Sequence, residues 1–173
     1  MNLSKNQILK YAKKYNDRYR GTEGKSIEIK MKRLLRRRKH LTRNDLIDVG
    51  CWKSKRIKKW LKSDYNDNKT VKDITRFCLN PKTKSEKARI EALLILKGVS
   101  WPVASAILHF AFPRKYPILD FRALWSLGWT KPPYYDFTFW QRYSQRITLI
   151  SKRLKLSIRT VDKALWEYSK EHQ

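Results

Sequence analysis

The sequence has few cysteines, few glycines and no long apolar run, and each shortage excludes a class of protein. Cys51 and Cys78 are too few for a disulfide framework, a four-cysteine zinc site or a cysteine-bound iron–sulfur cluster. We expect both to be buried thiols. No stretch of about twenty apolar residues is present, which excludes a transmembrane helix. The start M-N-L-S-K-N lacks the apolar core of a signal peptide, so we expect a cytoplasmic protein with no membrane partner.

Metal and nucleotide sites also lack their signatures. His40, His109 and His172 show no ligand spacing, and no glycine-rich nucleotide loop occurs among only 5 glycines. We therefore expect no metal and no small-molecule cofactor.

Acidic side chains are scarce, and basic ones are abundant. The 173 residues include 41 Lys plus Arg against 15 Asp plus Glu, a formal net charge of +26. Residues 1–80 hold 24 basic and 8 acidic side chains, and residues 81–173 hold 17 and 7, so the excess is not confined to a tail. Such a charge favours a polyanionic partner, and we expect double-stranded DNA; adhesion to a membrane or ribosome surface is the alternative from charge alone.

Apolar side chains recur with helical spacing along most of the chain, which predicts an all-α fold. Gly50 is expected to stop one short helix, and a helix from about Ser54 would place Ile57, Trp60 and Leu61 on one apolar face. Asp136 and Ser157 are expected N-caps of two final helices. We predict one compact, monomeric domain over 1–173, with a helical lobe over 21–130, a helical hairpin at 86–112, a short helix at 120–127, and terminal helices over 1–20 and 131–173 that pack together.

The hairpin is the clearest local pattern. Gly98 breaks a helix, Ser100 can cap the next one, and Pro102 falls in its first turn, where a missing N–H does no harm. The small residues Ala104, Ser105 and Ala106 would allow close helix packing. A turn of this kind points backbone N–H groups and the positive end of a helix at an anion. The alternative is an ordinary pair of core helices separated by glycine.

Three segments together resemble the helix-hairpin-helix Gly/Pro–Asp superfamily of DNA glycosylases. They are L-L-I-L-K-G-V-S-W-P-V-A at 93–104, Y-P-I-L-D at 116–120, and G-C-W-K-S-K-R-I-K-K-W at 50–60. Gly98 and Asp120 are 22 positions apart, the same spacing as in the endonuclease III and mismatch adenine glycosylase branches, from both of which this chain is otherwise distant. The resemblance covers about residues 45–128 and implies a two-lobed helical fold with a DNA-binding hairpin.

The departures from the family pattern narrow the implied chemistry. Ser100 stands where the second hairpin glycine is usual, and Pro102 stands where bifunctional members carry a Schiff-base lysine. The C-terminal four-cysteine cluster of the endonuclease III branch is also missing. The resemblance therefore implies a monofunctional hydrolase without lyase activity by the usual lysine.

Asp120 is the expected catalytic residue. A glycosylase extrudes its target base, and positive charge then develops on the sugar as the base departs. A carboxylate near the sugar C1′ atom stabilises that charge and orients or deprotonates the attacking water. The alternative role of Asp120 is the N-cap of the short helix F-R-A-L-W-S-L. No second carboxylate stands out as the acid among Glu23, Glu28, Asp45 and Asp48.

The remaining expected site residues fall into three groups, each with a purely structural alternative. Expected DNA contacts of the hairpin turn, whose alternative is the core helix pair already named, are Gly98, Val99 and Ser100. Expected phosphate contacts, whose alternative is a solvated side chain, are Lys97, Lys53, Lys55, Arg56, Arg114 and Lys115. Residues expected to line a base pocket or to act as a wedge, whose alternative is packing or a salt bridge, are Trp52, Trp101 and Arg122.

Three functions are consistent with these patterns. The first is a DNA glycosylase that serves DNA repair or defence against modified foreign DNA. The second is a helix-hairpin-helix protein that binds DNA without catalysis, and the third is a basic, RNA-associated helical protein. The first two predict salt-sensitive DNA binding, and only the first depends on Asp120 for activity.

Overall fold

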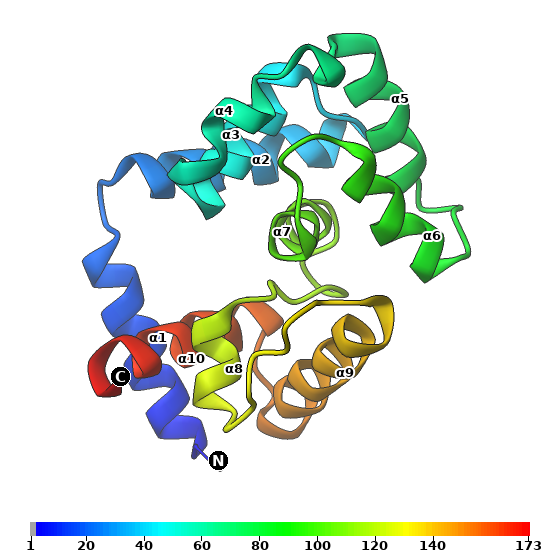
Figure 1. The fold of residues 1–173 in the computed structure, drawn as a ribbon. Helices are drawn as coiled ribbons and strands as arrows, with labels where there is room; N and C mark the ends of the chain where they lie inside the picture. The colour runs from blue at the N-terminus through cyan, green and yellow to red at the C-terminus, as the bar shows by residue number, and fades with distance from the viewer. Residues whose placement is uncertain (1–2) are drawn as a thin grey trace. The chain divides into compact units, whose positions relative to one another are not determined.

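The structure is a computed structural model that describes residues 3–173, and it is all-helical (Figure 1). Over these residues it contains ten α-helices, three short 3-10 helices and no strand, which confirms the predicted all-α class. The chain divides into two compact units. Glu23–Phe112 forms one, here called the central unit. The chain up to Thr22 and Pro113–Gln173 together form the other, the terminal unit.

The central unit is built around one buried helix, α7 (Trp101–Ala111). Residues 103–110 of α7 are all buried, because α2, α3, α6 and the 3-10 helix η3 all pack against it. The small side chains of Ala104, Ser105 and Ala106 let these neighbours approach closely. The other elements of the unit are α2 (Glu23–Arg37), α3 (Arg43–Lys53), η1 (Lys55–Ile57), α4 (Lys58–Leu61), η2 (Asp64–Asn66), α5 (Asn68–Cys78), α6 (Glu86–Glu91) and η3 (Ala92–Ile95).

Gly50 does not stop a helix, contrary to the prediction. Helix α3 continues to Lys53, and Gly50 lies inside it. A Cβ atom at Gly50 would lie 2.3 Å from Cδ1 of Leu61, which is fully buried. The glycine therefore allows α4 to pack directly against α3, a tertiary role that the local sequence does not distinguish from a helix stop.

Arg89 is a buried cation that holds the connection between α5 and α6. It is 2% exposed, and its guanidinium donates hydrogen bonds to the carbonyl groups of Cys78, Asn80 and Thr83. Desolvation raises the pKa of the adjacent Cys78 thiol to about 12, as expected for a buried cysteine. Cys51 is only half-buried, which differs from the prediction.

The terminal unit combines both ends of the chain. Helix α1 (Lys5–Arg18) packs along α10 (Ile158–His172), with Ile8, Tyr11, Ala12 and Ala164 in the shared core. Helices α8 (Phe121–Ser126) and α9 (Phe137–Leu154) also pack against α10. The predicted N-caps of the last two helices are confirmed, because Asp136 accepts a hydrogen bond from the Phe139 N–H and Ser157 accepts one from that of Thr160.

The boundary between the units differs from the predicted lobe over 21–130. The hairpin-bearing unit ends at Phe112, so α8 belongs to the terminal unit. Three buried hydrogen bonds attach the chain after Pro113 to this unit: the Ile118 N–H donates to the Asp162 carboxylate (3.1 Å), the Tyr143 hydroxyl to the Ile118 carbonyl (2.9 Å), and the Ser126 hydroxyl to the Leu165 carbonyl (2.6 Å). The Lys131-Pro132-Pro133 segment only connects α8 to α9.

Candidate functional site

The predicted hairpin is formed by α6 and η3, a glycine turn, and α7. The turn is closed by a hydrogen bond from the Val99 N–H to the Leu96 carbonyl (3.0 Å), and Gly98 has a φ of +84°. Residues that carry a side chain rarely adopt this backbone conformation, so the turn requires a glycine at position 98. Ser100 is the N-cap of α7, and Pro102 lies in its first turn, as predicted.

The N-terminus of α7 lacks a side-chain cap. The side chains of Thr42, Asp67 and Ser85 cap α3, α5 and α6, whereas neither Ser100 at α7 nor Ile57 at α4 makes a side-chain capping hydrogen bond. Within residues 3–173, no hydrogen bond occupies the backbone N–H groups of Gly98, Ser100 and Trp101. Ser100 is also exposed, so this end of the helix presents free donors and a positive dipole to an anion.

A buried asparagine that the sequence analysis missed holds the turn in place. Asn66, at the end of η2, is fully buried and bridges α4 to the turn. Its Nδ2 donates to the carbonyls of Leu61 (3.0 Å) and Lys97 (2.9 Å), and its Oδ1 accepts from the Lys97 N–H (2.8 Å). The surrounding letters S-D-Y-N-D-N are typical of a solvated loop, so no local signal marks this residue.

We expect Asn66→Ala to lower the free energy of unfolding by about 3 kcal/mol, because it leaves two carbonyls and one N–H of this buried network without partners. Asn68→Ala is the matched control: Asn68 is exposed and accepts one hydrogen bond, from the Arg43 N–H, so about 0.5 kcal/mol or less is expected. Urea denaturation of the three proteins measures both changes. Equal stability of the two variants would contradict the bracing role.

Asp120 is the N-cap of α8, in the terminal unit. Its Oδ1 accepts a hydrogen bond from the Arg122 N–H at 2.9 Å, and its side chain is half-buried. The cap that the sequence analysis set against catalysis is therefore present. A cap of this kind fixes the orientation of the carboxylate, and it also sets the carboxylate at the positive end of a helix.

Two tyrosines lie close enough to Asp120 to sense its charge. Burial raises the pKa of Tyr135, and the negative charge of Asp120 raises it further. Tyr143 is fully buried, and burial raises its pKa well above the ordinary value, with smaller contributions from Asp162 and then Asp120. Both phenols are therefore neutral hydroxyl groups over the physiological pH range, and Tyr135 is the more accessible of the two.

The other expected site residues divide between the two units. Lys97, Gly98, Val99, Ser100, Lys53, Lys55, Arg56, Trp52 and Trp101 lie in the central unit, and Arg114, Lys115, Asp120 and Arg122 lie in the terminal unit. Val99 is buried, so only its backbone is available to a ligand. Lys97, Lys55, Arg56, Arg114 and Lys115 are exposed, whereas Lys53 is half-buried at the end of α3.

The aromatic residues of the expected base pocket have structural contacts. Trp52 is half-buried and packs edge-on against Phe110 of α7, with ring centroids 5.0 Å apart, which favours its structural role. Trp101 is half-buried in the first turn of α7. The Arg122 guanidinium lies over the rings of Phe121 (5.1 Å) and Trp166 (5.3 Å), so it takes part in cation–π contacts inside its own unit.

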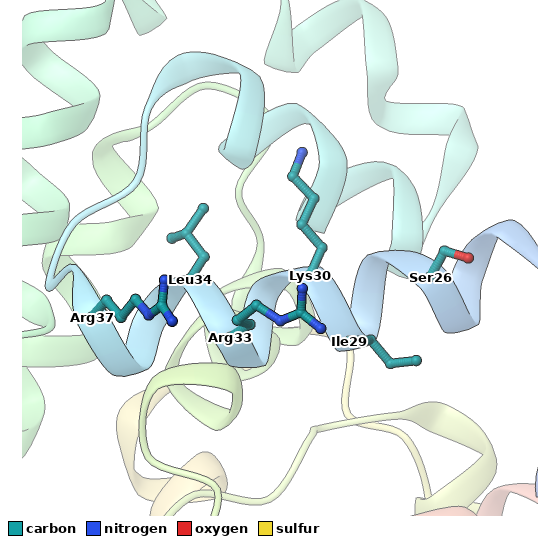
Figure 2. A pocket seen from close by; sticks show the side chains of 6 residues that line it. All are labelled: Ser26, Ile29, Lys30, Arg33, Leu34 and Arg37. Carbon is teal, nitrogen blue, oxygen red and sulfur yellow. The ribbon is translucent and has the colours of Figure 1, made fainter.

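A second basic surface lies on the outer face of α2 (Figure 2). It surrounds a hollow of about 480 Å³ lined by Ser26, Ile29, Lys30, Arg33, Leu34 and Arg37. Lys30 pairs with Asp48 at 2.6 Å, and this hydrogen bond raises the Lys30 pKa. Arg33 and Arg37 are exposed and make no hydrogen bond or ion pair with any residue of 3–173, so their charges remain available to an anionic ligand.

No group of three or more His, Cys, Asp or Glu side chains in residues 3–173 is arranged to hold a metal ion. None of the helices in this range combines the length and the apolar character needed to cross a bilayer.

Comparisons with known proteins found no significant match to a protein-family model, to a curated protein or to a solved structure.

Proposed function

We propose that the protein is a monofunctional DNA glycosylase that binds DNA through the Gly98–Ser100 turn and uses Asp120 for hydrolytic excision of an extruded base. The observation that supports this most directly is the hairpin itself. Gly98 adopts a positive φ, and the following helix begins with unoccupied N–H donors beside the exposed Lys97. This is the chemistry that holds a phosphate.

The charge distribution supports a nucleic-acid partner for the same unit. Lys55 is exposed in η1 and pairs with Glu23 at 3.5 Å, whereas the exposed Arg56 of η1 and Arg33 and Arg37 of α2 have no acidic partner among residues 3–173. When exposed cations without acidic partners bind phosphates, they displace counterions from the nucleic acid, so their contribution to the affinity depends on the salt concentration.

The proposed reaction is hydrolysis at the sugar. The oxygen of a water molecule forms a bond to C1′, the bond from C1′ to the base nitrogen breaks, and its electron pair leaves with the base. One proton of the water ends on the released base, and the hydroxyl remains on the sugar. The Asp120 carboxylate, held by its bond to the Arg122 N–H, would stabilise positive charge at C1′ and orient the water.

Pro102 stands where bifunctional members of the resembled family carry a Schiff-base lysine, so the covalent lyase mechanism is not available by that route. Its ring nitrogen is part of the backbone of α7 and has no side-chain amine to form a Schiff base. We therefore expect an intact abasic site as the product, without strand cleavage by the protein.

The direct test is a panel of duplexes that carry mispaired adenine, alkylated, deaminated or otherwise modified bases. After incubation, mass spectrometry identifies any free base, and alkali cleavage reveals the abasic sites. Release of one base class, with no strand break before alkali treatment, is the expected result. Strand breaks without alkali would contradict the monofunctional mechanism.

A non-catalytic helix-hairpin-helix DNA-binding protein is the second candidate, and the capping bond of Asp120 favours it. A carboxylate whose only role is to cap α8 would be replaceable without any loss of DNA binding. This candidate predicts salt-sensitive binding to DNA and no free base from any member of the panel.

A further inference from the structure

Trp60 is an exposed aromatic residue beside the hairpin turn. Ile57, Trp60 and Leu61 were expected to share one apolar face. In the structure, Leu61 is fully buried, but 47% of Trp60 is exposed. Ile57 ends η1, whereas Trp60 and Leu61 lie in α4, so the three residues do not share one continuous helix face.

Trp60 lies directly beside the glycine turn. A Cβ atom built on Gly98 would lie 2.9 Å from the Trp60 Cβ and 3.3 Å from its carbonyl carbon. Asn66 ties the same two segments together through Leu61 and Lys97. The position of the Trp60 backbone relative to the turn is therefore fixed by packing and by buried hydrogen bonds.

Two cations flank the indole ring. The Nζ atom of Lys59 lies 4.8 Å from the ring centroid, and that of Lys97 lies 5.5 Å from it. Both lysines are exposed, and no acidic residue of the described chain pairs with either of them. The indole ring of Trp60 and the ammonium groups of Lys59 and Lys97 thus lie together beside the glycine turn. The ring offers a face on which a base can stack, and the ammonium groups offer positive charge to phosphates.

We propose that Trp60 stacks on an unpaired base next to the phosphate that the hairpin turn binds, so that the protein prefers DNA with an unstacked nucleotide to a fully paired duplex. Lys59 and Lys97 bind the flanking phosphates. This inference rests on the proposed binding of DNA by the hairpin. It does not depend on Asp120 or on catalysis. A base inside a paired duplex cannot offer its face to the ring, which is the physical reason for the preference.

The experiment measures binding by fluorescence anisotropy with two labelled DNAs, a fully paired duplex and the same duplex with a one-nucleotide bulge, over a series of salt concentrations. The variants are Trp60→Ala, Trp60→Phe, and the double substitution Lys59→Gln with Lys97→Gln. Alanine retains the Cβ that packs against Gly98. Trp125→Ala is the matched control, because Trp125 is 38% exposed in the terminal unit.

Trp60→Ala is expected to lower affinity for the bulged DNA by about 5- to 100-fold, and for the paired duplex by no more than about 2-fold. Because stacking is not ionic, the slope of log K against log salt should stay unchanged, and Trp60→Phe should recover part of the affinity. The lysine double variant should instead reduce that slope by about 0.9 for each lost phosphate contact. Trp125→Ala should change neither binding constant.

The outcomes separate this inference from the proposed function. Equal losses on both DNAs, or no loss, for Trp60→Ala would overturn the stacking role while leaving hairpin binding intact. If the lysine variant retains full affinity and slope on both DNAs, the assignment of Lys59 and Lys97 to flanking phosphates is wrong, and if the unaltered protein binds neither DNA, DNA binding through the hairpin itself fails. Circular-dichroism melting of every variant identifies any loss that comes from unfolding, and Trp60→Phe preserves the packing if alanine does not.

Discussion

Replacing Asp120 by asparagine is expected to reduce the rate of base release by about 100- to 1000-fold while leaving DNA binding unchanged. Asparagine removes the negative charge that would stabilise the developing positive charge at C1′. It preserves the hydrogen bond to the Arg122 N–H, because asparagine and aspartate are about equally good N-caps. Single-turnover release of the base measures the effect, with anisotropy on the same DNA as the binding check.

Asp120→Ala separates the two roles of this side chain. Alanine removes both the charge and the cap, so it should lose the same activity as asparagine and also about 1 kcal/mol of stability. A cap-only role predicts the reverse pattern, in which asparagine behaves like the unaltered protein and alanine alone is impaired. Base release by Asp120→Asn at the original rate would therefore refute the proposed mechanism.

A second large effect is expected from Gly98→Ala, which should lower the free energy of unfolding by about 3 kcal/mol and DNA affinity at least tenfold. Two costs combine at this position. The φ of +84° is unfavourable for any side chain, and the added Cβ would come within 2.9 Å of Trp60 Cβ and 3.2 Å of the Leu61 nitrogen. Relief of this clash would displace the turn N–H groups from the phosphate.

Gly128→Ala is the control for the first of these costs. Gly128 has a φ of +71°, but nothing lies within 4 Å of the position that its Cβ would take. It should lose only about 1 kcal/mol, and its DNA affinity should be unchanged. Urea denaturation and anisotropy at a temperature where both variants are folded compare the two glycines, and equal effects would show that the approach of Trp60 to the turn is unimportant.

The features predicted correctly from sequence are those with a local cause. Helical periodicity gave the all-α class. The conformational freedom of glycine marked the turn at Gly98, and the missing N–H of Pro102 marked the first turn of α7. Short polar side chains marked the N-caps Asp136 and Ser157. Each of these preferences acts within a few residues of the chain, so a single sequence is sufficient to reveal it.

The features that the sequence did not reveal depend on contacts between distant segments. The local sequence around Gly50 is typical of a helix stop, but the glycine is needed for the close packing of Leu61. The local sequence around Asn66 is typical of a loop, but its amide donates a hydrogen bond to the Lys97 carbonyl. The apolar pattern of Ile57, Trp60 and Leu61 is divided between η1 and α4, and Trp60 is exposed while Leu61 is buried. The chain after Phe112 likewise belongs to the terminal unit through contacts between distant residues, such as the hydrogen bond between Ile118 and Asp162, 44 residues apart.

The terminal unit draws on both ends of the chain, and this has a consequence for synthesis on the ribosome. Helix α1 contributes Ile8, Tyr11 and Ala12 to a core that is completed only by Ala164 of α10. The nascent α1 must therefore keep an apolar face uncovered until α10 has been made, whereas the central unit is contiguous and can collapse earlier. Pulse proteolysis of stalled nascent chains should accordingly show protection of the central unit first, with α1 becoming resistant only after α10 leaves the exit tunnel.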